Sequence, residues 1–220
     1  MVILVNDQKP WGFRGEGGDL KGASVDFALA LGKELDHPFD IDVAPYHRLL
    51  KDFEAGRIDY TFFLEDQKPD GAIPVVKLID VDIVVVGRSG LEINRVEDLQ
   101  GLRVGKIRGA LYSDKLMLGQ QGFECIEIHS YRQAIDLLKK GRLDAILGTP
   151  LPIVYAAKDM GVHLDFFGDS FLFDQKAAWI YTTQQSQHRD KVKDIQAAVE
   201  KMIKNNVLSD IAATYLEFKH

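Results

Sequence analysis

This sequence of 220 residues has a single cysteine, no long apolar run and no excess of basic residues. Because a lone Cys125 cannot form a disulfide within the chain, cysteine content leaves the redox compartment open. No stretch approaches the roughly 20 apolar residues that a membrane-spanning helix needs. Asp and Glu number 33 against 27 Lys and Arg, and the resulting net charge of −6 argues against nucleic-acid binding, which depends on a basic surface.

Patterns typical of catalysis and metal binding are missing too. The six histidines are scattered without a close ligand pair, so we expect no bound metal. The glycine-rich run GFRGEGGDLKG at 12–22 lacks the Gly-Lys-Ser/Thr of a phosphate loop, and its acidic residues would repel phosphate. GRSG at 87–90 has the wrong spacing for a nucleophile elbow. We therefore expect no cofactor and no catalytic residue.

Composition is that of a soluble globular protein, with 46 % hydrophobic and 27 % charged residues. The length suits one large domain or two small ones. Cys125 lies in the alternating run FECIEI at 123–128, and we expect a buried small side chain there. The chain opens on VILVND without a signal peptide, which fits either a cytosolic protein or a mature exported one with a replacement Met1.

One phrase occurs twice, as YHRLLKDFEAGRIDYTFFLE at 46–65 and YRQAIDLLKKGRLDAILGTP at 131–150. In both, a Tyr precedes a helix-patterned stretch and Gly-Arg-[Ile/Leu]-Asp follows at the same offset. Each Gly is suited to the left-handed conformation that ends a helix, and each Asp then opens a strand. This pattern favours a structural role for the repeated residues over a catalytic one.

Hydrophobic periodicity gives both halves the same order of elements. The expected strands are 2–6, 39–45, 58–64, 102–107, 123–129 and 143–149, and the expected helices are 23–35, 47–56, 111–122 and 132–141. Strands that alternate with helices predict parallel sheets built from right-handed crossovers. The fold class is therefore α/β, with two βαβαβ units.

Two further strands, 81–87 and 177–183, connect the halves, and a helical tail at 189–216 follows, with a break near Asn205 and Asn206. We expect one apolar face on the helix at 23–35, with Val25 and Leu29, and one on the tail, formed by Val192, Ile195, Val199, Met202 and Ile203. Two crossing strands form a hinge, which suits closure around a small ligand.

The domain organisation expected from this order has two lobes, each a mainly parallel sheet flanked by helices. Lobe 1 comprises residues 1–86 and 184–220, and lobe 2 comprises residues 87–183.

Four segments, GDLKGASVDFALALGKEL, YHRLLKDFEAGRIDYTFF, VEDLQGLRVGKIRGALY and GRLDAILGTP, resemble the family-3 extracellular solute-binding proteins of polar-amino-acid ABC transporters. The closing VEKMIKNNVLSDIAATYLE is similar to that family's last helices. The resemblance implies the type II periplasmic-binding-protein fold and a periplasmic protein whose signal peptide is absent from this chain. It further implies closure on a small polar solute, with an ABC-transporter permease or a membrane sensor as partner.

In lobe 1 the resemblance assigns the ligand contacts to two places. An aromatic after the first strand lies over the ligand in the family, and here Trp11 in KPWGF fits, with Phe13 nearby. The end of the third strand supplies backbone and short polar groups, which here are Leu64 and Glu65.

In lobe 2 the family receives the ligand carboxylate at a helix N-terminus. The equivalent run here is RGALYS, which gives the candidates Arg108, Gly109, Ala110, Tyr112 and Ser113. A carboxylate after the last strand meets the ligand ammonium in the family, and here that position is Thr149.

Two departures from the family bear on the ligand. The run EDQKPDGAIPVVKLID at 65–80 contains no Arg to grip an α-carboxylate, and Thr149 is not an acid. Arg108 and Glu65 are candidates to replace the lost cation and anion. With the usual pair of charges missing, we expect weak or no binding of common α-amino acids.

Two alternatives stay open. One is an enzyme similar to cyclohexadienyl dehydratases, in which Glu65 would protonate a leaving hydroxyl. The other is a ligand-sensing module that docks on a membrane signalling protein. The leading hypothesis is a non-enzymatic, monomeric binding protein without nucleic-acid partners.

Overall fold

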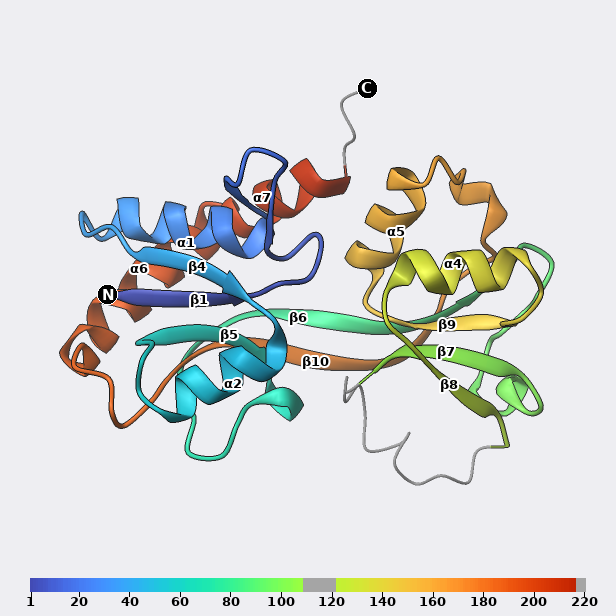
Figure 1. Cartoon of the computed structure of the whole chain (residues 1–220), viewed down its shortest axis with the longest axis horizontal. Coiled ribbons are helices and arrows are strands. Elements are labelled where there is room, and N and C mark those ends of the chain that lie inside the picture. The colour runs from blue at the N-terminus through green and yellow to red at the C-terminus, as the bar shows by residue number, and fades with distance from the viewer. Residues whose placement is uncertain (109–121, 217–220) are drawn as a thin grey trace. The chain divides into compact units, whose positions relative to one another are not determined.

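The computed structural model describes residues 1–108 and 122–216 (Figure 1). The chain divides into two compact units: unit 1 is Met1–Ile79 with Ala177–His220, and unit 2 is Asp80–Lys176. Both divisions fall inside long strands, β6 (Ile73–Gly87) and β10 (Phe171–Thr182), which therefore contribute residues to both units. The expected boundaries after residues 86 and 183 lie at the far ends of the same two strands, and the two lobes stay a prediction.

The strands follow the hydrogen-bonded order β4-β1-β5-β10-β6-β9-β7-β8, with β6 and β10 in its centre. Beside them, β2 (Phe13–Arg14) pairs with β3 (Leu20–Lys21) in a separate small hairpin. Within the described residues no helix has the length and apolar character needed to cross a membrane.

In unit 1, β4, β1 and β5 are parallel, and β10 runs antiparallel to β5. The bounds are β1 Val2–Asn6, β4 Asp40–Ala44, β5 Tyr60–Leu64, α1 Ala23–Glu34, α2 Tyr46–Glu54, α6 Val192–Lys204 and α7 Val207–Leu216. Ile3 and Val5 of β1 enter the core under α1 and α6, while Leu4 enters the core under α2. The first four residues of β1 are apolar because helices cover both faces of its sheet (Figure 1).

Unit 2 repeats this arrangement, because the order β9-β7-β8 matches β5-β1-β4 and the strands are again parallel. Its elements are β7 Arg103–Ile107, β8 Glu124–Ile128, β9 Ala145–Gly148, α4 Tyr131–Lys139 and α5 Pro150–Asp159. Strand β6 runs antiparallel to β9, as β10 does to β5. The core contains Ile135 and Leu138 of α4 against Ile146 of β9. The remaining short helical turns are Glu65–Gln67, Val96–Leu99, Leu164–Phe166 and Arg189–Lys191.

The repeated phrase has the same structural role in both units. Gly56 and Gly141 follow α2 and α4 with φ of 67° and 65°, so both end a helix in the left-handed conformation as predicted. The Asp59 carboxylate accepts the backbone N–H of Val2 at 2.8 Å, and its own N–H donates to the Val2 carbonyl at 3.0 Å.

The second copy makes the same pair of bonds. The Asp144 carboxylate accepts the N–H of Arg103 at 2.8 Å, and the Asp144 N–H donates to the Arg103 carbonyl at 2.9 Å. Each aspartate therefore binds the first residue of the middle one of the three parallel strands in its unit. This contact explains why the phrase recurs.

The two copies differ in what else the aspartate binds. In unit 2 the Arg103 guanidinium donates to both Asp144 oxygens, at 2.9 and 3.0 Å, and this ion pair lowers the pKa of Asp144. In unit 1 the Ser186 hydroxyl donates to Asp59 at 2.7 Å instead.

Several expectations about single side chains are wrong. Leu29, expected on the buried face of α1, is 57 % exposed, and Ile203 of the tail is 40 % exposed. Cys125 is exposed, because it alternates with Ile126 and Ile128 on the edge strand β8, and these two isoleucines pack in the core. The helix break at Asn206 is confirmed, with a φ of 61° between α6 and α7. Helix α5 was not expected.

We predict that Asp144→Asn lowers the free energy of unfolding by about 1–2 kcal/mol at pH 7. This value is the usual contribution of a charge-assisted hydrogen bond to stability, reduced because the ion pair is partly exposed. Because the folded pKa of Asp144 lies below its ordinary value, this stabilisation is present above pH ~4 and is lost as the pH falls further. Denaturant unfolding measured from pH 7 to pH ~2.5 should show the unfolding free energies of the parent and Asp144→Asn becoming equal in acid.

The control for this prediction is Asp136→Asn, on the exposed side of α4. It should change stability by less than ~0.5 kcal/mol at every pH. A difference between the parent and Asp144→Asn that stays constant down to pH ~2.5 would contradict the role given to the ion pair.

Candidate functional site

In unit 1 the candidate residues follow two neighbouring parallel strands. Residue Ile3 of β1 is aligned with Tyr60 of β5, so the carboxyl ends of the two strands lie at the same edge of the sheet. The loop that carries Trp11 leaves β1 at this edge, and Glu65 comes directly after β5. In open α/β sheets, ligands bind beside the carboxyl ends of the strands.

The Trp11 loop is held through its backbone. Carbonyl oxygens of Pro10 and Trp11 accept the N–H groups of Ala23 and Ser24 at the start of α1, at 2.8 and 2.9 Å. The Trp11 N–H donates to the Gln8 carbonyl at 2.7 Å. Because the backbone makes these bonds, the half-buried indole is available for other contacts.

The other aromatic of this loop, Phe13, lies in β2 and is half-buried. The Lys9 ammonium stands 5.1 Å from the centre of its ring, a cation–π contact. Phe13 therefore has a partner within the loop itself.

Glu65 has a structural contact in addition to its proposed role. Its carboxylate accepts the backbone N–H of Ala177 in β10 at 3.2 Å. Burial, together with the charges of Glu65 and Asp66, raises the pKa of Tyr181 to about 12. Leu64, at the end of β5, is half-buried.

In unit 2 the candidates also follow neighbouring strands. Arg108 comes directly after β7 and Thr149 directly after β9, and these two strands are parallel, with Gly105 aligned with Ile146. Thr149 is 7 % exposed and precedes α5, yet its side chain does not cap that helix. Arg108 is exposed, and its guanidinium donates to the Glu127 carboxylate at 3.1 Å.

The structure does not test the whole set of candidates. Gly109, Ala110, Tyr112 and Ser113 lie outside the described residues, as do residues 111–121 of the helix expected at 111–122. The assignment of ligand contacts to Trp11, Phe13, Leu64, Glu65, Arg108 and Thr149 stays a prediction.

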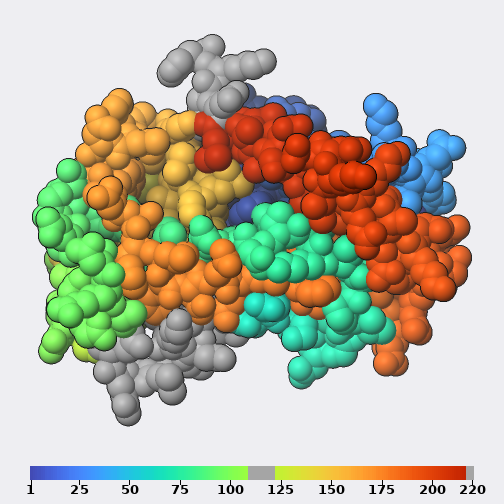
Figure 2. Space-filling model, turned by 180° about the vertical axis from the view of Figure 1, so that it is seen from behind, coloured from blue at the N-terminus to red at the C-terminus, as the bar shows by residue number. Residues whose placement is uncertain are grey.

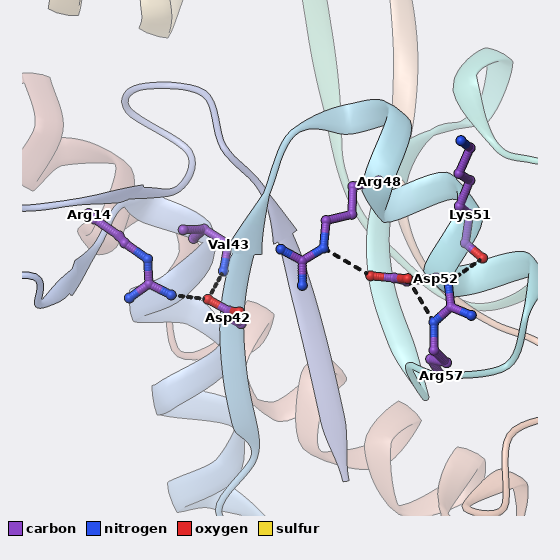
Figure 3. Close-up of polar contacts among 7 residues, drawn as sticks. All are labelled: Arg14, Asp42, Val43, Arg48, Lys51, Asp52 and Arg57. Carbon is purple, nitrogen blue, oxygen red and sulfur yellow. Dashed lines mark hydrogen bonds and ion pairs between the residues drawn. The ribbon is translucent and has the colours of Figure 1, made fainter.

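Sequence reasoning missed a charged groove of about 320 Å³ in unit 1, between α2 and the edge strand β4. Figure 3 shows its ion pairs: Arg14 with Asp42 on one side, and Arg48 and Arg57 on either side of Asp52 on the other. The hydrogen bond from Arg57 lowers the pKa of Asp52. Only the four-residue spacing of Arg48 and Asp52 on α2 was a signal in the sequence.

Among residues 1–108 and 122–216, no group of three or more His, Cys, Asp or Glu side chains is placed to hold a metal ion.

Two relatives are similar over most of the chain. The L-cystine-binding protein TcyJ of Escherichia coli K12 is 25 % identical over 218 residues, covering 96 % of this chain and 80 % of the relative. The probable amino-acid-binding protein YxeM of Bacillus subtilis 168 is 22 % identical over 208 residues, covering 91 % and 77 %. No family model matches the sequence.

Solved structures are similar over nearly the whole chain. An ancestral arginine-binding protein bound to arginine has a TM-score of 0.72 at 20 % identity, with 98 % of both chains covered. A histidine kinase sensor domain with similarity to periplasmic binding proteins has a TM-score of 0.79 at 15 % identity, covering 98 % and 96 %. The fold is the type II periplasmic-binding-protein fold, and the resemblance to family-3 solute-binding proteins is confirmed by TcyJ and YxeM.

We predict that Trp11→Ala changes the free energy of unfolding by less than ~1 kcal/mol, because the backbone holds the loop. If the indole covers a bound solute, the same change weakens binding by about 1–3 kcal/mol. Thermal unfolding and calorimetric titration measure the two quantities.

The matched control is Trp179→Ala, whose half-buried indole packs against the core under α2. It should cost about 2 kcal/mol or more of stability. If instead Trp11→Ala is the strongly destabilising variant, then Trp11 is a core residue and the assignment is wrong.

Proposed function

We propose that this chain is a non-enzymatic solute-binding protein that delivers a small polar molecule to an ABC-transporter permease. The observation that carries the proposal is the agreement with binding proteins over nearly the full length, in sequence and in fold. The topology supports it, since Trp11 and Glu65 follow the carboxyl ends of β1 and β5, and Arg108 and Thr149 follow those of β7 and β9. An exported, periplasmic location and a monomeric state belong to the same proposal.

The charges of the candidate residues favour a solute that differs from a standard amino-acid zwitterion. Arg108 is exposed and paired with Glu127, Thr149 is neutral, and the Glu65 carboxylate holds a β10 amide. An ammonium and a carboxylate buried without partners would each cost several kcal/mol. We infer that the solute carries fewer charges than a zwitterion, as amines, simple carboxylates or amino acids with a blocked amino or carboxyl group do.

The non-enzymatic part of the proposal depends mainly on Glu65, the acid considered for a dehydratase. Its carboxylate accepts the backbone N–H of Ala177 in β10, so one of its oxygens already has a structural partner within the fold.

A thermal-shift screen over amino acids, amines, carboxylates and short peptides tests the proposal. A solute at a hundredfold excess over its Kd should stabilise the protein by roughly 2.7 kcal/mol. The screen should include prephenate and arogenate with product analysis, because turnover of either would overturn the non-enzymatic assignment. Absence of any stabilising compound for the folded protein would count against solute binding.

We predict that calorimetric titration with each of the twenty common amino acids gives no Kd below ~1 µM. A Kd of ~1 µM corresponds to a binding free energy of about −8.2 kcal/mol. The reason is the missing pair of charges. Sub-micromolar binding of any of the twenty would mean that the clamp residues are misplaced, while the binding function itself would be supported.

A further inference from the structure

We propose that Tyr215, in the last turn of α7, is a positioning residue for the Trp11 loop. The proposal deepens the proposed function, since it concerns the loop expected to contact the solute. All residues involved belong to unit 1. Figure 2 shows the C-terminal helices, in red, on the surface of the molecule.

The Tyr215 hydroxyl makes two hydrogen bonds at the start of α1. It accepts the backbone N–H of Gly22 at 3.0 Å, a residue 193 positions away, and it donates to the Asp26 carboxylate at 2.6 Å. Both bonds use the single hydroxyl, one as acceptor and one as donor. Tyr215 thereby joins the last helix to the first.

The position of Gly22 explains why this bond matters. Gly22 is the N-cap of α1, and a glycine has no side chain with which to satisfy the free N–H groups of a helix start. These groups are satisfied from elsewhere: Pro10 and Trp11 accept from Ala23 and Ser24, and Tyr215 accepts from Gly22. The Trp11 loop and Tyr215 therefore hold the same helix start from two sides.

Gly22 is also in close contact with the backbone of Trp11. Its φ is 129°, in the region that favours glycine, and a Cβ atom added there would lie 2.3 Å from the Trp11 carbonyl oxygen. Because the backbones of Gly22 and Trp11 pack closely without a gap, a shift of Gly22 moves the Trp11 backbone with it. The Tyr215 hydroxyl thus fixes the place from which the Trp11 indole projects.

Helix α7 packs on the core through partly buried side chains. None of its residues is fully buried, and it contributes Val207, Leu208 and Ile211 only as partly buried neighbours of the core. Elements with few buried contacts open at a low free-energy cost. Opening of α7 would release Gly22 and so couple the C-terminal helix to the Trp11 loop.

The test compares Tyr215→Phe with Tyr46→Phe. Both changes remove one hydroxyl in unit 1 and keep the ring, since the Tyr46 hydroxyl donates to the Gln67 carbonyl at 2.7 Å. Both are made in a Trp179→Phe background, where Trp11 is the single remaining tryptophan of two. Solute-free protein is used, so the result is independent of whether the proposed function is correct.

For Tyr215→Phe we expect amide hydrogen exchange at Gly22 to rise about tenfold, with Ala23 and Ser24 following, since the bond that protects Gly22 is lost. We also expect acrylamide quenching of Trp11 fluorescence to rise roughly 1.5- to 2-fold. Tyr46→Phe should change neither. A structural role alone would shift the melting temperature of both variants without a selective effect on Trp11.

The proposal would be overturned if Tyr215→Phe and Tyr46→Phe showed equal hydrogen exchange at Gly22 and equal quenching of Trp11 fluorescence. Asp26→Asn provides a second variant if Tyr215→Phe is poorly folded, because it changes only the carboxylate that accepts the hydrogen bond of the Tyr215 hydroxyl. A smaller rise of both signals in Asp26→Asn supports the proposal, and no rise in either variant contradicts it.

Discussion

Burial of both faces of the parallel strands is the constraint on which the rest of this structure depends. Ile3, Leu4 and Val5 of β1 are at most 3 % exposed, although they point alternately to opposite sides of the sheet. Helices must cover both faces, and each parallel strand must therefore be reached by a crossover. Polar and aromatic residues that are not part of the core therefore lie in the loops that begin where the strands end. Trp11 and Glu65 in unit 1, and Arg108 and Thr149 in unit 2, follow strand ends for this reason.

The same constraint explains the repeated Gly-Arg-[Ile/Leu]-Asp. A crossover helix must stop sharply so that the chain can return to the sheet, and a left-handed glycine allows that turn. The strand that follows must align with the central strand, and the aspartate carboxylate fixes the alignment through the N–H of Val2 or Arg103. Turn and alignment are separate physical tasks, and one short phrase performs both. The two units diverged in the additional partner, a buried serine in unit 1 and an arginine in unit 2.

The Trp11 loop shows how a side chain can project from a loop whose backbone is fixed by hydrogen bonds. Its carbonyl groups satisfy the start of α1, which ties the loop to a rigid element while the indole stays outside that network. Loops held in this way carry side chains at defined positions without placing them in the core. The Tyr215 hydroxyl extends the arrangement to the end of the chain, so that the first and last helices together support one loop.

Much of the fold could be predicted from the sequence because local rules determine it. Hydrophobic period, glycine stops and the order of elements gave the α/β class, the internal repeat and the break at Asn206, and all are seen in the structure. The local pattern failed for Leu29 and Cys125, whose exposure depends on what packs against a helix face or an edge strand. It also missed α5, whose run is too apolar for a clear helical period.

The sequence by itself determined the two copies, the residues that end each helix and the loops expected to carry the candidate site. Only the tertiary structure decided which groups the candidate residues bind: Arg108 with Glu127, and Glu65 with the Ala177 amide. The bond between Tyr215 and Gly22 is the extreme case, with 193 residues between its partners. Hydrophobic periodicity depends only on residues close together in the sequence. The partners named above are brought together by the packing of whole helices and strands, so no local sequence pattern indicates these contacts.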